Sequence, residues 1–372
     1  MSVTVERLSA EDAPLVLKFP SVLYADDPCW VPPLRAWEGR RLTRAATDPG
    51  RMALFVARRG GSVVGTISAS REQPPPADPA SKPVRFGYFE SIDDPAVASA
   101  LVSAAAGQAR AWGGRRLLGP MNLSRFEFVG LAVSGLDTLP PLMQAQHRPH
   151  YAGLLEGTGL TKHHDVFAYA RSLVDPSGLP SPLPPALLEK AGRCQIPGLE
   201  IRAARRLRLG RDIEDVFTVL NEAYATVPDI SPMSRATFMG LGRAMFALAG
   251  PGLIQIAAVE GRPVGFAVCI PELNEALVSC RGRLLPLGWA RLLGGLGRIE
   301  TAAFKLIGVL PSCRGSGLHA ALIAAVIRGA QAAGYRRVDG SVIDERNQPM
   351  RRVVEGAGLS VYRTYRFYGL EL

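Results

Sequence analysis

The chain has little cysteine, and it has no long apolar run. The five cysteines, Cys29, Cys194, Cys269, Cys280 and Cys313, are dispersed and form no C-x-x-C pair. An odd, scattered set is typical of a reduced intracellular protein and argues against a disulfide framework. No apolar stretch approaches the roughly 18 residues of a membrane-spanning helix, so stable membrane insertion is not expected. The chain begins with acidic residues and no apolar signal core, which predicts a cytoplasmic protein.

Lysine is also scarce, so the positive charge comes almost entirely from arginine. The net charge is +10, yet the arginines are scattered and no block of like charges forms a basic tail. This pattern argues against a nucleic-acid partner. A phosphorylated small molecule would need only a local site.

The 372 residues are too many for one ordinary domain and indicate two. A proline-rich stretch, residues 174–199, contains SGLPSPLPP and is the predicted linker between residues 1–173 and 200–372. Each half is expected to run helix, hairpin, strand, helix, strand, strand, with hairpin turns at Gly60-Gly61 and at Glu260-Gly261. The sequence therefore predicts an α/β fold with mixed sheets and a domain-sized duplication.

A glycine loop in the second half carries the strongest chemical signal. A predicted strand, residues 304–310, runs into Arg314-Gly315-Ser316-Gly317 and then into a long helix that ends near Gly334. The expected inner face of this helix is Leu318, Leu322, Ile323, Val326 and Ile327. Backbone N–H groups at such a helix start can hold a phosphate or diphosphate, and the helix dipole favours the negative charge. The other interpretation is a glycine turn that only caps a buried helix.

This region resembles the GNAT superfamily of acyl-CoA-dependent N-acyltransferases. Arg314-x-x-Gly317-x-His319 is similar to the family's R/Q-x-x-G-x-G/A signature, and NQPMRRVVEGAGL at 347–359 is similar to its second signature. The segments LYADDPCWVPPL and GPMNLSRFEFVGL resemble parts of bacterial tandem-GNAT proteins. The resemblance implies two tandem GNAT-like domains, with acetyl-CoA or another acyl-CoA as co-substrate and no metal.

The resemblance also implies a set of residues that bind the cofactor. The strand would hold the pantetheine arm, the loop the diphosphate, and an asparagine the arm or the turn below it. These residues are Leu306, Ile307, Gly308, Val309, Cys313, Arg314, Gly315, Ser316, Gly317, Leu318, His319 and Asn347. The sequence departs from the family at two places. His319 replaces the usual Gly or Ala and is either a further phosphate contact or an exposed first-turn histidine. Val354 stands where many members have an acidic tyrosine.

Candidates for acid–base chemistry flank these motifs. Glu272, together with Glu275 and Glu300, is a candidate base; each could instead be a solvated surface acid. Tyr365 and Tyr368, or Tyr362, are candidate acids on the last strand; the alternative is aromatic core packing. Strand alternation puts Tyr362 and Tyr368 on one face and Tyr365 on the other. Cys313 is interpreted as a passive loop residue.

The first half is expected to be a degenerate domain that does not bind CoA. Where the phosphate loop should lie, the sequence reads SIDDPAVAS, and Asp93 and Asp94 would repel a diphosphate. Four histidines, His147, His150, His163 and His164, lack metal-ligand spacing and are interpreted as loop residues.

An arginine- and leucine-rich segment, residues 272–299, remains open to several interpretations. It could be a lid or acceptor pocket, a homodimer contact, or a membrane-surface helix. For the whole chain, the leading hypothesis is an enzyme that moves an acetyl or longer acyl group from acyl-CoA to an amine of a small molecule or peptide. The alternative is a non-catalytic acyl-CoA sensor or scaffold.

Overall fold

The computed structural model describes two compact units within the single chain. It describes every residue except 1, 72–77, 79, 124–128, 226–234 and 251. Part of the segment GPMNLSRFEFVGL therefore lies outside the described residues. Unit 1 comprises Met1–Phe167, Asn274–Gly297 and Arg363–Leu372, and unit 2 comprises Ala168–Leu273 and Arg298–Tyr362.

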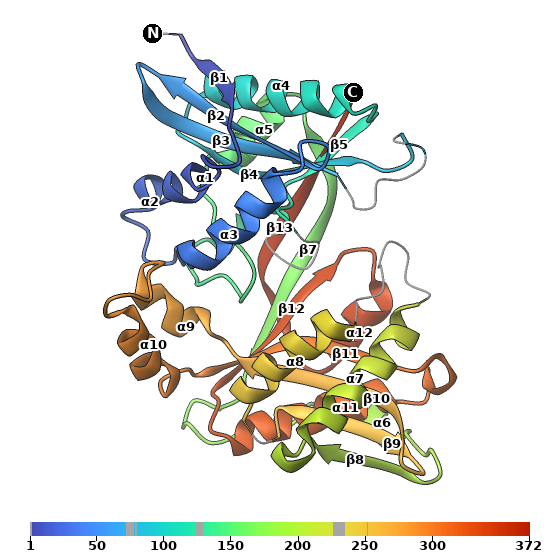
Figure 1. The fold of residues 1–372 in the computed structure, drawn as a ribbon. Coiled ribbons are helices and arrows are strands. Elements are labelled where there is room, and N and C mark those ends of the chain that lie inside the picture. The colour runs from blue at the N-terminus through green and yellow to red at the C-terminus, as the bar shows by residue number, and fades with distance from the viewer. Residues whose placement is uncertain (1, 72–77, 79, 124–128, 226–234, 251) are drawn as a thin grey trace. The chain divides into compact units, whose positions relative to one another are not determined.

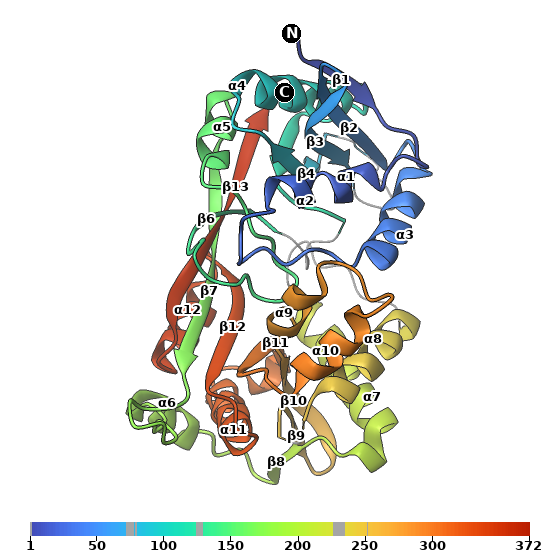
Figure 2. The ribbon, with the colours of Figure 1, turned by 90° about the vertical axis from the view of Figure 1, so that its left-hand side faces the viewer.

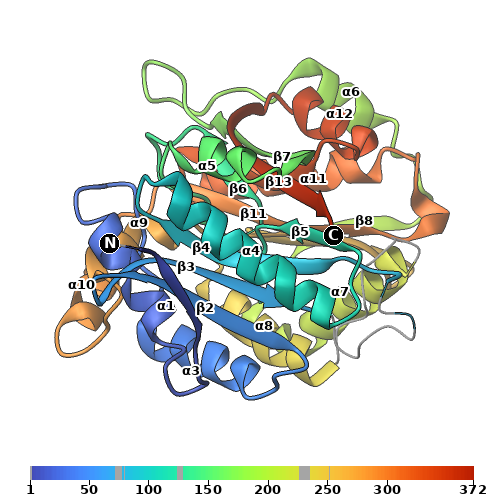
Figure 3. The ribbon, with the colours of Figure 1, turned by 90° about the horizontal axis from the view of Figure 1, so that it is seen from above.

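Unit 1 is a sheet with helices on both faces (Figure 1). Its strands are β1 (Thr4–Arg7), β2 (Met52–Arg59), β3 (Ser62–Ser70), β4 (Val84–Ser91), β5 (Arg116–Gly119) and β6 (Leu131–Ser134), and most of β13 (Ser360–Glu371). The order is β1-β2-β3-β4-β5-β13, with β6 also on β13, and β4 and β5 are parallel. The helices are α1 (Leu15–Lys18), α2 (Pro20–Leu23), α3 (Arg35–Ala46), α4 (Pro95–Ala111), α5 (Tyr151–Gly157), α9 (Asn274–Leu277) and α10 (Gly288–Leu296). Helix α4 crosses one face of β2 and β3 (Figure 3) and forms a core with them.

Unit 2 has the same kind of layered sheet. Its strands are β8 (Leu199–Ala203), β9 (Ile254–Val259), β10 (Arg262–Pro271), β11 (Thr301–Val309) and β12 (Arg337–Asp344), and the end of β7 (Thr161–Ser172). They follow the order β7-β12-β11-β10-β9-β8. The helices are α6 (Pro185–Gly192), α7 (Leu209–Tyr224), α8 (Arg235–Leu248), α11 (Leu318–Ala332) and α12 (Gln348–Gly356). Figure 2 shows α11 on one side of β9 and β10, with α7 and α8 on the other.

Local sequence patterns explain the elements that border the glycine loop. The five residues expected on the inner face of α11 are all buried, so that prediction is confirmed. Gly334 has a φ of +84°, the left-handed conformation that ends many helices. The β9–β10 hairpin turns at Glu260 and Gly261, both with positive φ, as its two-residue turn requires.

The strand exchange between units could not be read from local patterns. The predicted element order gives each half its own final strand, but Arg363–Leu372 lies in unit 1, where Tyr368 pairs with Gly119. The last residues of β7 lie in unit 2, where the N–H of Leu173 donates to the Arg336 carbonyl at 2.8 Å. The boundaries 1–173, 174–199 and 200–372 describe a division along the sequence and stay a prediction.

The proline-rich stretch between the halves is not structureless, because it contains α6. Pro185 begins this helix, and its missing N–H costs nothing in a first turn. Helix α6 packs on α11, and its carboxyl end approaches the glycine loop. In the described part of the chain, no helix has both the length and the apolar character needed to cross a bilayer.

Candidate functional site: a forked sheet beside an amide-lined loop

The sheet of unit 2 forks at the middle of β11. In the part of the chain that the structure describes, β11 and β12 pair in parallel from Thr301 to Ala303, with Arg337 to Asp339 as partners. On the other side of β11, Phe304 pairs with Cys269 and Leu306 with Val268, so Lys305 is an extra residue that forms a bulge. A bulge bends its strand and increases the local twist. The bulge therefore lies where the recorded pairing with β12 ends.

A cleft of about 210 Å³ lies in this fork. It is mostly apolar, with contributions from both strands and from the helices that flank them. The lining residues are Phe304, Lys305, Ile307, Ile323, Ile327, Val338, Gly340, Val342, Ile343, Asp344, Asn347, Met350, Val354 and Leu359. A Cβ on Gly340 would lie 2.7 Å from the end of the Leu359 side chain and 3.1 Å from the Cβ of Tyr169, so glycine leaves this wall of the cleft uncrowded. The shape and polarity suit an extended, largely apolar chain with few polar groups.

The loop before α11 presents backbone N–H groups that other groups do not use. Gly315 and Gly317 have φ values of +80° and +91°, and Ser316 Oγ donates to the Cys313 carbonyl at 2.7 Å. Among the residues that the structure describes, no hydrogen bond is recorded for the N–H groups of Gly315, Ser316, Gly317, His319 and Ala320. Amides of this kind at a helix N-terminus are ordinary ligands of phosphate oxygens.

Neighbouring elements hold this loop in place. The Arg314 guanidinium donates to the Ala223 carbonyl of α7 at 2.7 Å, so part of its role is to anchor the loop. A Cβ on Gly317 would lie 2.4 Å from the Lys190 carbonyl of α6, and only glycine permits this approach. His319 is half-buried, and the alternative interpretation of an exposed histidine is wrong. Its burial, with a smaller effect of Arg314, lowers its pKa and favours the neutral ring.

The remaining cofactor-binding residues predicted from the sequence lie along the cleft or next to it. Leu306 to Val309 form the second half of β11, and a Cβ on Gly308 would lie 2.6 Å from Phe266. Asn347 lines the cleft and caps α12, with its Oδ1 accepting from the N–H of Met350 at 3.3 Å. Val354 also lines the cleft and is buried, so it supplies an apolar wall and no proton.

A polar group at the base of the fork was missed in the sequence. Asp339 is buried on β12, and the Tyr362 hydroxyl donates to its Oδ2. The Arg337 guanidinium lies 4.6 Å from the centre of the Tyr362 ring. Because Val338, Gly340 and Val342 line the cleft, strand alternation turns Asp339 to the opposite face of the sheet. Of these three residues, the sequence pointed only to Tyr362, which was one of the three candidate acids on the last strand.

The pKa of the Cys269 thiol shows that the charges of Lys305 and Asp339 act at the same place. The thiol is fully buried, and burial raises its pKa well above the ordinary value. The Lys305 ammonium lowers this pKa and the Asp339 carboxylate raises it, so both charges act on the thiol. Lys305 at the bulge on β11 and Asp339 at the end of the β11–β12 pairing therefore both lie close enough to Cys269 to act on its thiol.

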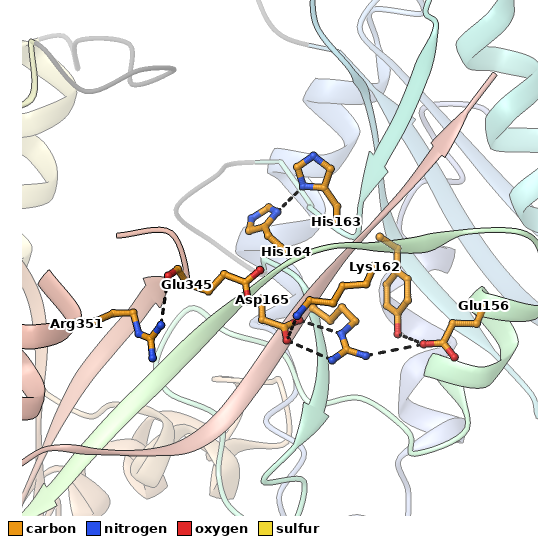
Figure 4. Close-up of polar contacts among 9 residues, drawn as sticks. Glu156, Lys162, His163, His164, Asp165, Glu345 and Arg351 are labelled. Atoms are coloured by element: carbon orange, nitrogen blue, oxygen red, sulfur yellow. Dashed lines mark hydrogen bonds and ion pairs between the residues drawn. The ribbon is translucent and has the colours of Figure 1, made fainter. Parts of the chain in front are cut away.

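The tyrosines first suggested as acids belong to the core of unit 1. Tyr365 and Tyr368 are fully buried, and the Tyr368 hydroxyl donates to Glu156 Oε1 at 3.0 Å. Burial and then the hydrogen bond to Glu156 raise the Tyr368 pKa to about 12. Figure 4 shows Glu156 close to the ion pair of Lys162 and Asp165. A catalytic role for Tyr365 and Tyr368 stays a prediction, and neither residue is among those that line the cleft of unit 2.

The candidate bases from the sequence differ in their surroundings. Glu272 is 5% exposed, so its interpretation as a solvated surface acid is wrong. Its backbone N–H donates to the Thr301 carbonyl at 2.9 Å, which holds it beside the start of β11. Glu300 is exposed, with Arg336 at 3.9 Å, and Glu275 is half-buried. None of the three lines the cleft.

The start of α4 in unit 1 differs from the start of α11. Asp94 caps α4 by accepting from the N–H of Ala96 at 2.8 Å, and it also pairs with Arg59 at 2.6 Å. The hydrogen bond from Arg59, followed by the backbone amide, lowers the pKa of Asp94. The protein's own carboxylate thus satisfies this helix start, whereas Gly317 offers no side-chain cap to α11.

Unit 1 contains a cavity of about 80 Å³ whose mostly apolar lining includes a few polar side chains. Glu90 borders it and accepts from the hydroxyls of Tyr24 and Tyr151 at 3.0 and 2.7 Å. Burial raises the Glu90 pKa to about 7 despite these two hydrogen bonds. His147 borders the same cavity, and burial followed by the charge of Arg363 lowers its pKa to about 3. Burial at this cavity therefore disfavours the charged form of both side chains.

The histidines form no metal centre in the part of the chain that the structure describes. No group of three or more His, Cys, Asp or Glu side chains with suitable geometry is present there. His163 and His164 contact each other through their Nδ1 atoms at 2.7 Å (Figure 4). His147 accepts from the backbone N–H of Ala132 at 3.0 Å, which is a structural role.

Comparison with known proteins agrees with this geometry. Residues 215–358 match the family model described as the acetyltransferase (GNAT) family. The chain is 33% identical over 363 residues to a protein named bacterial ceramide synthase from Caulobacter vibrioides, covering 95% of this chain and 93% of the relative. The chain belongs to the GNAT acyltransferase family. This membership implies an acyl-CoA co-substrate, which the amide-lined loop and the cleft can accommodate.

Further relatives support the same class over the whole chain. Protein YghO of Escherichia coli is 29% identical over 371 residues, covering 97% of this chain and 93% of that protein. A solved tandem GNAT protein from the clavulanic acid biosynthesis pathway is 16% identical with a TM-score of 0.55, covering 100% of this chain and 98% of that one. A GNAT structure from Sphaerobacter thermophilus gives a TM-score of 0.54 at 15% identity, over 99% and 95% of the two chains. The fold is thus a tandem GNAT fold of mixed α/β type.

Proposed function

We propose that unit 2 transfers an acyl group from acyl-CoA to the primary amine of a long-chain amphipathic acceptor. The observation that carries the proposal is the combination of an apolar fork and an amide-lined helix start in one unit. A ceramide is the amide of a fatty acid with a long-chain amino alcohol, so the name of the Caulobacter relative supports an acceptor of that class. The largely apolar cleft agrees with an acyl group longer than acetyl.

The five unused amides from Gly315 to Ala320 are suited to the diphosphate of the co-substrate. The pantetheine arm would then follow the second half of β11 into the cleft. Asp94 caps the corresponding helix of unit 1, so we assign a single co-substrate site to each chain. Unit 1 is in this respect a degenerate partner of unit 2.

The reaction requires a neutral amine, because a protonated amine has no lone pair. An alkylamine with a pKa near 10.4 is neutral in roughly one molecule in 2,500 at pH 7, a cost of about 4.6 kcal/mol. A carboxylate that takes the amine proton reduces this cost. We assign that role to Asp339, which lies on the face of β12 opposite the cleft, so that the amine would enter the fork from that face while the acyl-CoA occupies the cleft. The neutral amine nitrogen then bonds to the thioester carbon, the C–S bond breaks, and the departing thiolate takes the second nitrogen proton and leaves as the free thiol of CoA.

The groups around Asp339 have matching roles in this proposal. Tyr362 donates to Asp339 and fixes the orientation of the carboxylate. Lys305 lines the cleft at the bulge, where its charge can stabilise the developing oxyanion or the departing thiolate. Glu272 and the tyrosines of unit 1, Tyr365 and Tyr368, remain the earlier candidates for acid–base roles.

Thiol release from acyl-CoA, measured against a panel of amines, tests the proposed function. We expect turnover with long-chain amino alcohols and little with short polar amines. Asp339→Asn should lower kcat roughly 100-fold, the size of a general-base contribution. Tyr362→Phe should lower it less, and CoA affinity should stay unchanged in both. Glu300→Gln is the control, since this carboxylate is exposed. Binding of acyl-CoA without thiol release across the panel would instead favour a non-catalytic sensor.

A further inference from the structure

The chain carries an exposed apolar tip around the start of α10. Its members are Leu284, Leu285, Leu287, Trp289 and Leu293, with exposures of 37%, 77%, 63%, 51% and 60%. Single exposed leucines are common on protein surfaces, but five exposed apolar side chains within ten residues, one of them a tryptophan, are not. We refer to these five residues as the Leu-Trp tip. Such a surface requires an explanation in terms of what it contacts.

The base of the tip is an ordered part of unit 1. Asn274 Nδ2 donates to the Pro140 carbonyl at 2.9 Å, and the N–H of Arg35 donates to the Gly282 carbonyl at 3.2 Å. Cys280 is buried and its thiol donates to the Gly288 carbonyl at 3.3 Å. A Cβ on Gly288 would lie 1.8 Å from the Arg283 carbonyl, so the turn is tightly packed. The apolar side chains are thus displayed by a closely packed support.

The charged side chains of residues 276–297, the segment that carries the tip, all have one sign. Arg281, Arg283 and Arg291 are exposed, and the segment contains no Asp or Glu. Within the part of the chain that the structure describes, none of these three arginines makes an ion pair. Leucines and a tryptophan surrounded by unpaired arginines match the interfacial region of an anionic lipid bilayer.

We propose that the Leu-Trp tip docks this protein onto the surface of a membrane that contains anionic lipid. The leucines enter the boundary between headgroups and acyl chains, and the arginines contact lipid phosphates. Tryptophan is enriched at this depth because its ring is apolar and its N–H is polar. The Trp289 indole already donates to the Pro286 carbonyl at 2.9 Å, so its N–H does not oppose insertion.

Charge distinguishes this partner from a second copy of the chain. A symmetric contact between two copies would bring the same surface of each against the other. Three arginines of one tip would then face three of the next without any acid from this segment to offset them. The inference does not depend on the proposed function, although a membrane would be the source of a long-chain amine acceptor.

Co-sedimentation of the full-length protein with lipid vesicles tests the proposal. We expect binding to vesicles of phosphatidylcholine mixed with phosphatidylglycerol, and weak binding to phosphatidylcholine alone. The double substitution Leu285→Asp with Leu287→Asp should weaken binding at least roughly tenfold, because two inserted apolar groups become charged. Leu207→Asp is the control, since Leu207 is a fully exposed leucine on unit 2.

A second set of variants separates charge from apolar insertion. Each arginine near an anionic surface should contribute roughly fivefold to affinity, so the triple change of Arg281, Arg283 and Arg291 to Glu should nearly abolish binding. Arg243→Glu, an exposed position on unit 2, should have little effect. Added salt should weaken the wild-type interaction. Quenching of tryptophan fluorescence by brominated lipid should fall sharply in Trp289→Phe.

Two results would overturn the proposal. One is equal vesicle binding by the wild type and both sets of tip variants. The other is a change of molecular mass by light scattering in the aspartate variant, because this would identify a second copy as the partner. Thiol release with an amine added in solution should remain in the tip variants. A loss of vesicle binding with retained thiol release therefore tests docking independently of catalysis.

Discussion

At the residue scale, glycine positions determine the shape of the amide-lined loop. Gly315 and Gly317 both adopt positive φ, but only Gly317 has a neighbour that would meet a Cβ. The sequence predicted the loop and its diphosphate chemistry because the spacing of these glycines is local information. It did not predict that α6 supplies the neighbouring carbonyl, since α6 lies more than a hundred residues earlier in the chain.

Gly317→Ala should destabilise unit 2 by roughly 1–3 kcal/mol, because it combines an unfavourable φ with a contact that is too short. Gly315→Ala has the same φ penalty but meets open space, and should cost about 1 kcal/mol. Urea unfolding of the two variants measures the difference. Equal losses would show that the approach of α6 to the loop is not tight.

The Glu90 carboxyl of unit 1 should make stability depend on pH. Its pKa is about 7 in the folded protein and near 4.5 when unfolded, so the folded state holds more protons between these values. Stability contributed by this group is therefore present at low pH and is lost as pH rises through about 7. Glu90→Gln should remove this loss of stability. The free energy of unfolding of the variant, relative to the wild type, should therefore rise by roughly 3 kcal/mol from about pH 5 to about pH 8.

Denaturant unfolding of both proteins at several pH values measures this difference. His147, on the same cavity, has a lowered pKa and loses stability as pH falls, so wild-type data alone would mix two effects. The comparison with the Gln variant isolates Glu90. A difference in stability that does not change with pH would contradict the assignment.

At the scale of elements, amphipathic periodicity predicted α11 and the hairpins, whereas the fork required structure. The buried face of α11 was predicted residue by residue. The bulge at Lys305 and the pair of Asp339 and Tyr362 depend on register between strands distant in sequence. Alternation separates Tyr365 from Tyr362 and Tyr368, but it could not assign Tyr362 to unit 2 and the other two tyrosines to unit 1.

Asn347 connects α12 to the cleft, and its removal should affect both stability and cofactor affinity. Asn347→Ala deletes the cap on the N–H of Met350 and should cost about 1 kcal/mol. Asn347→Asp keeps an acceptor at the helix start and should restore most of this loss. Thermal unfolding together with CoA titration measures the two effects. An alanine variant as stable as the wild type would show that the cap contributes nothing.

At the scale of the whole molecule, the units depend on each other's sequence. Arg363–Leu372 completes the sheet of unit 1, and Asn274–Gly297 leaves the middle of the second half to join the same unit. The prolines at 174–199 suggested a clean division, since composition cannot reveal where distant strands pair. A fragment that ends at residue 173 would lack the strand that pairs with β5.

Deletion of residues 363–372 should therefore loosen unit 1 more than unit 2. Hydrogen exchange is expected to speed up at the amides of α4 and β5, while α11 keeps most of its protection. Mass spectrometry of peptides from both units measures this contrast. Equal loss of protection in the two units would mean that they unfold as one cooperative body.

The central claim is that the amides at the start of α11 hold the diphosphate of an acyl-CoA. Calorimetric titration of the full-length protein with CoA and with pantetheine, which lacks the diphosphate, tests it most directly. CoA should bind at a single site per chain and at least roughly tenfold more tightly than pantetheine. The reason is that hydrogen bonds from the loop amides to the charged diphosphate are stronger than hydrogen bonds between neutral groups. The double variant Gly315→Ala with Gly317→Ala should lose this preference and still bind pantetheine. An unchanged preference for CoA in that variant would contradict the account.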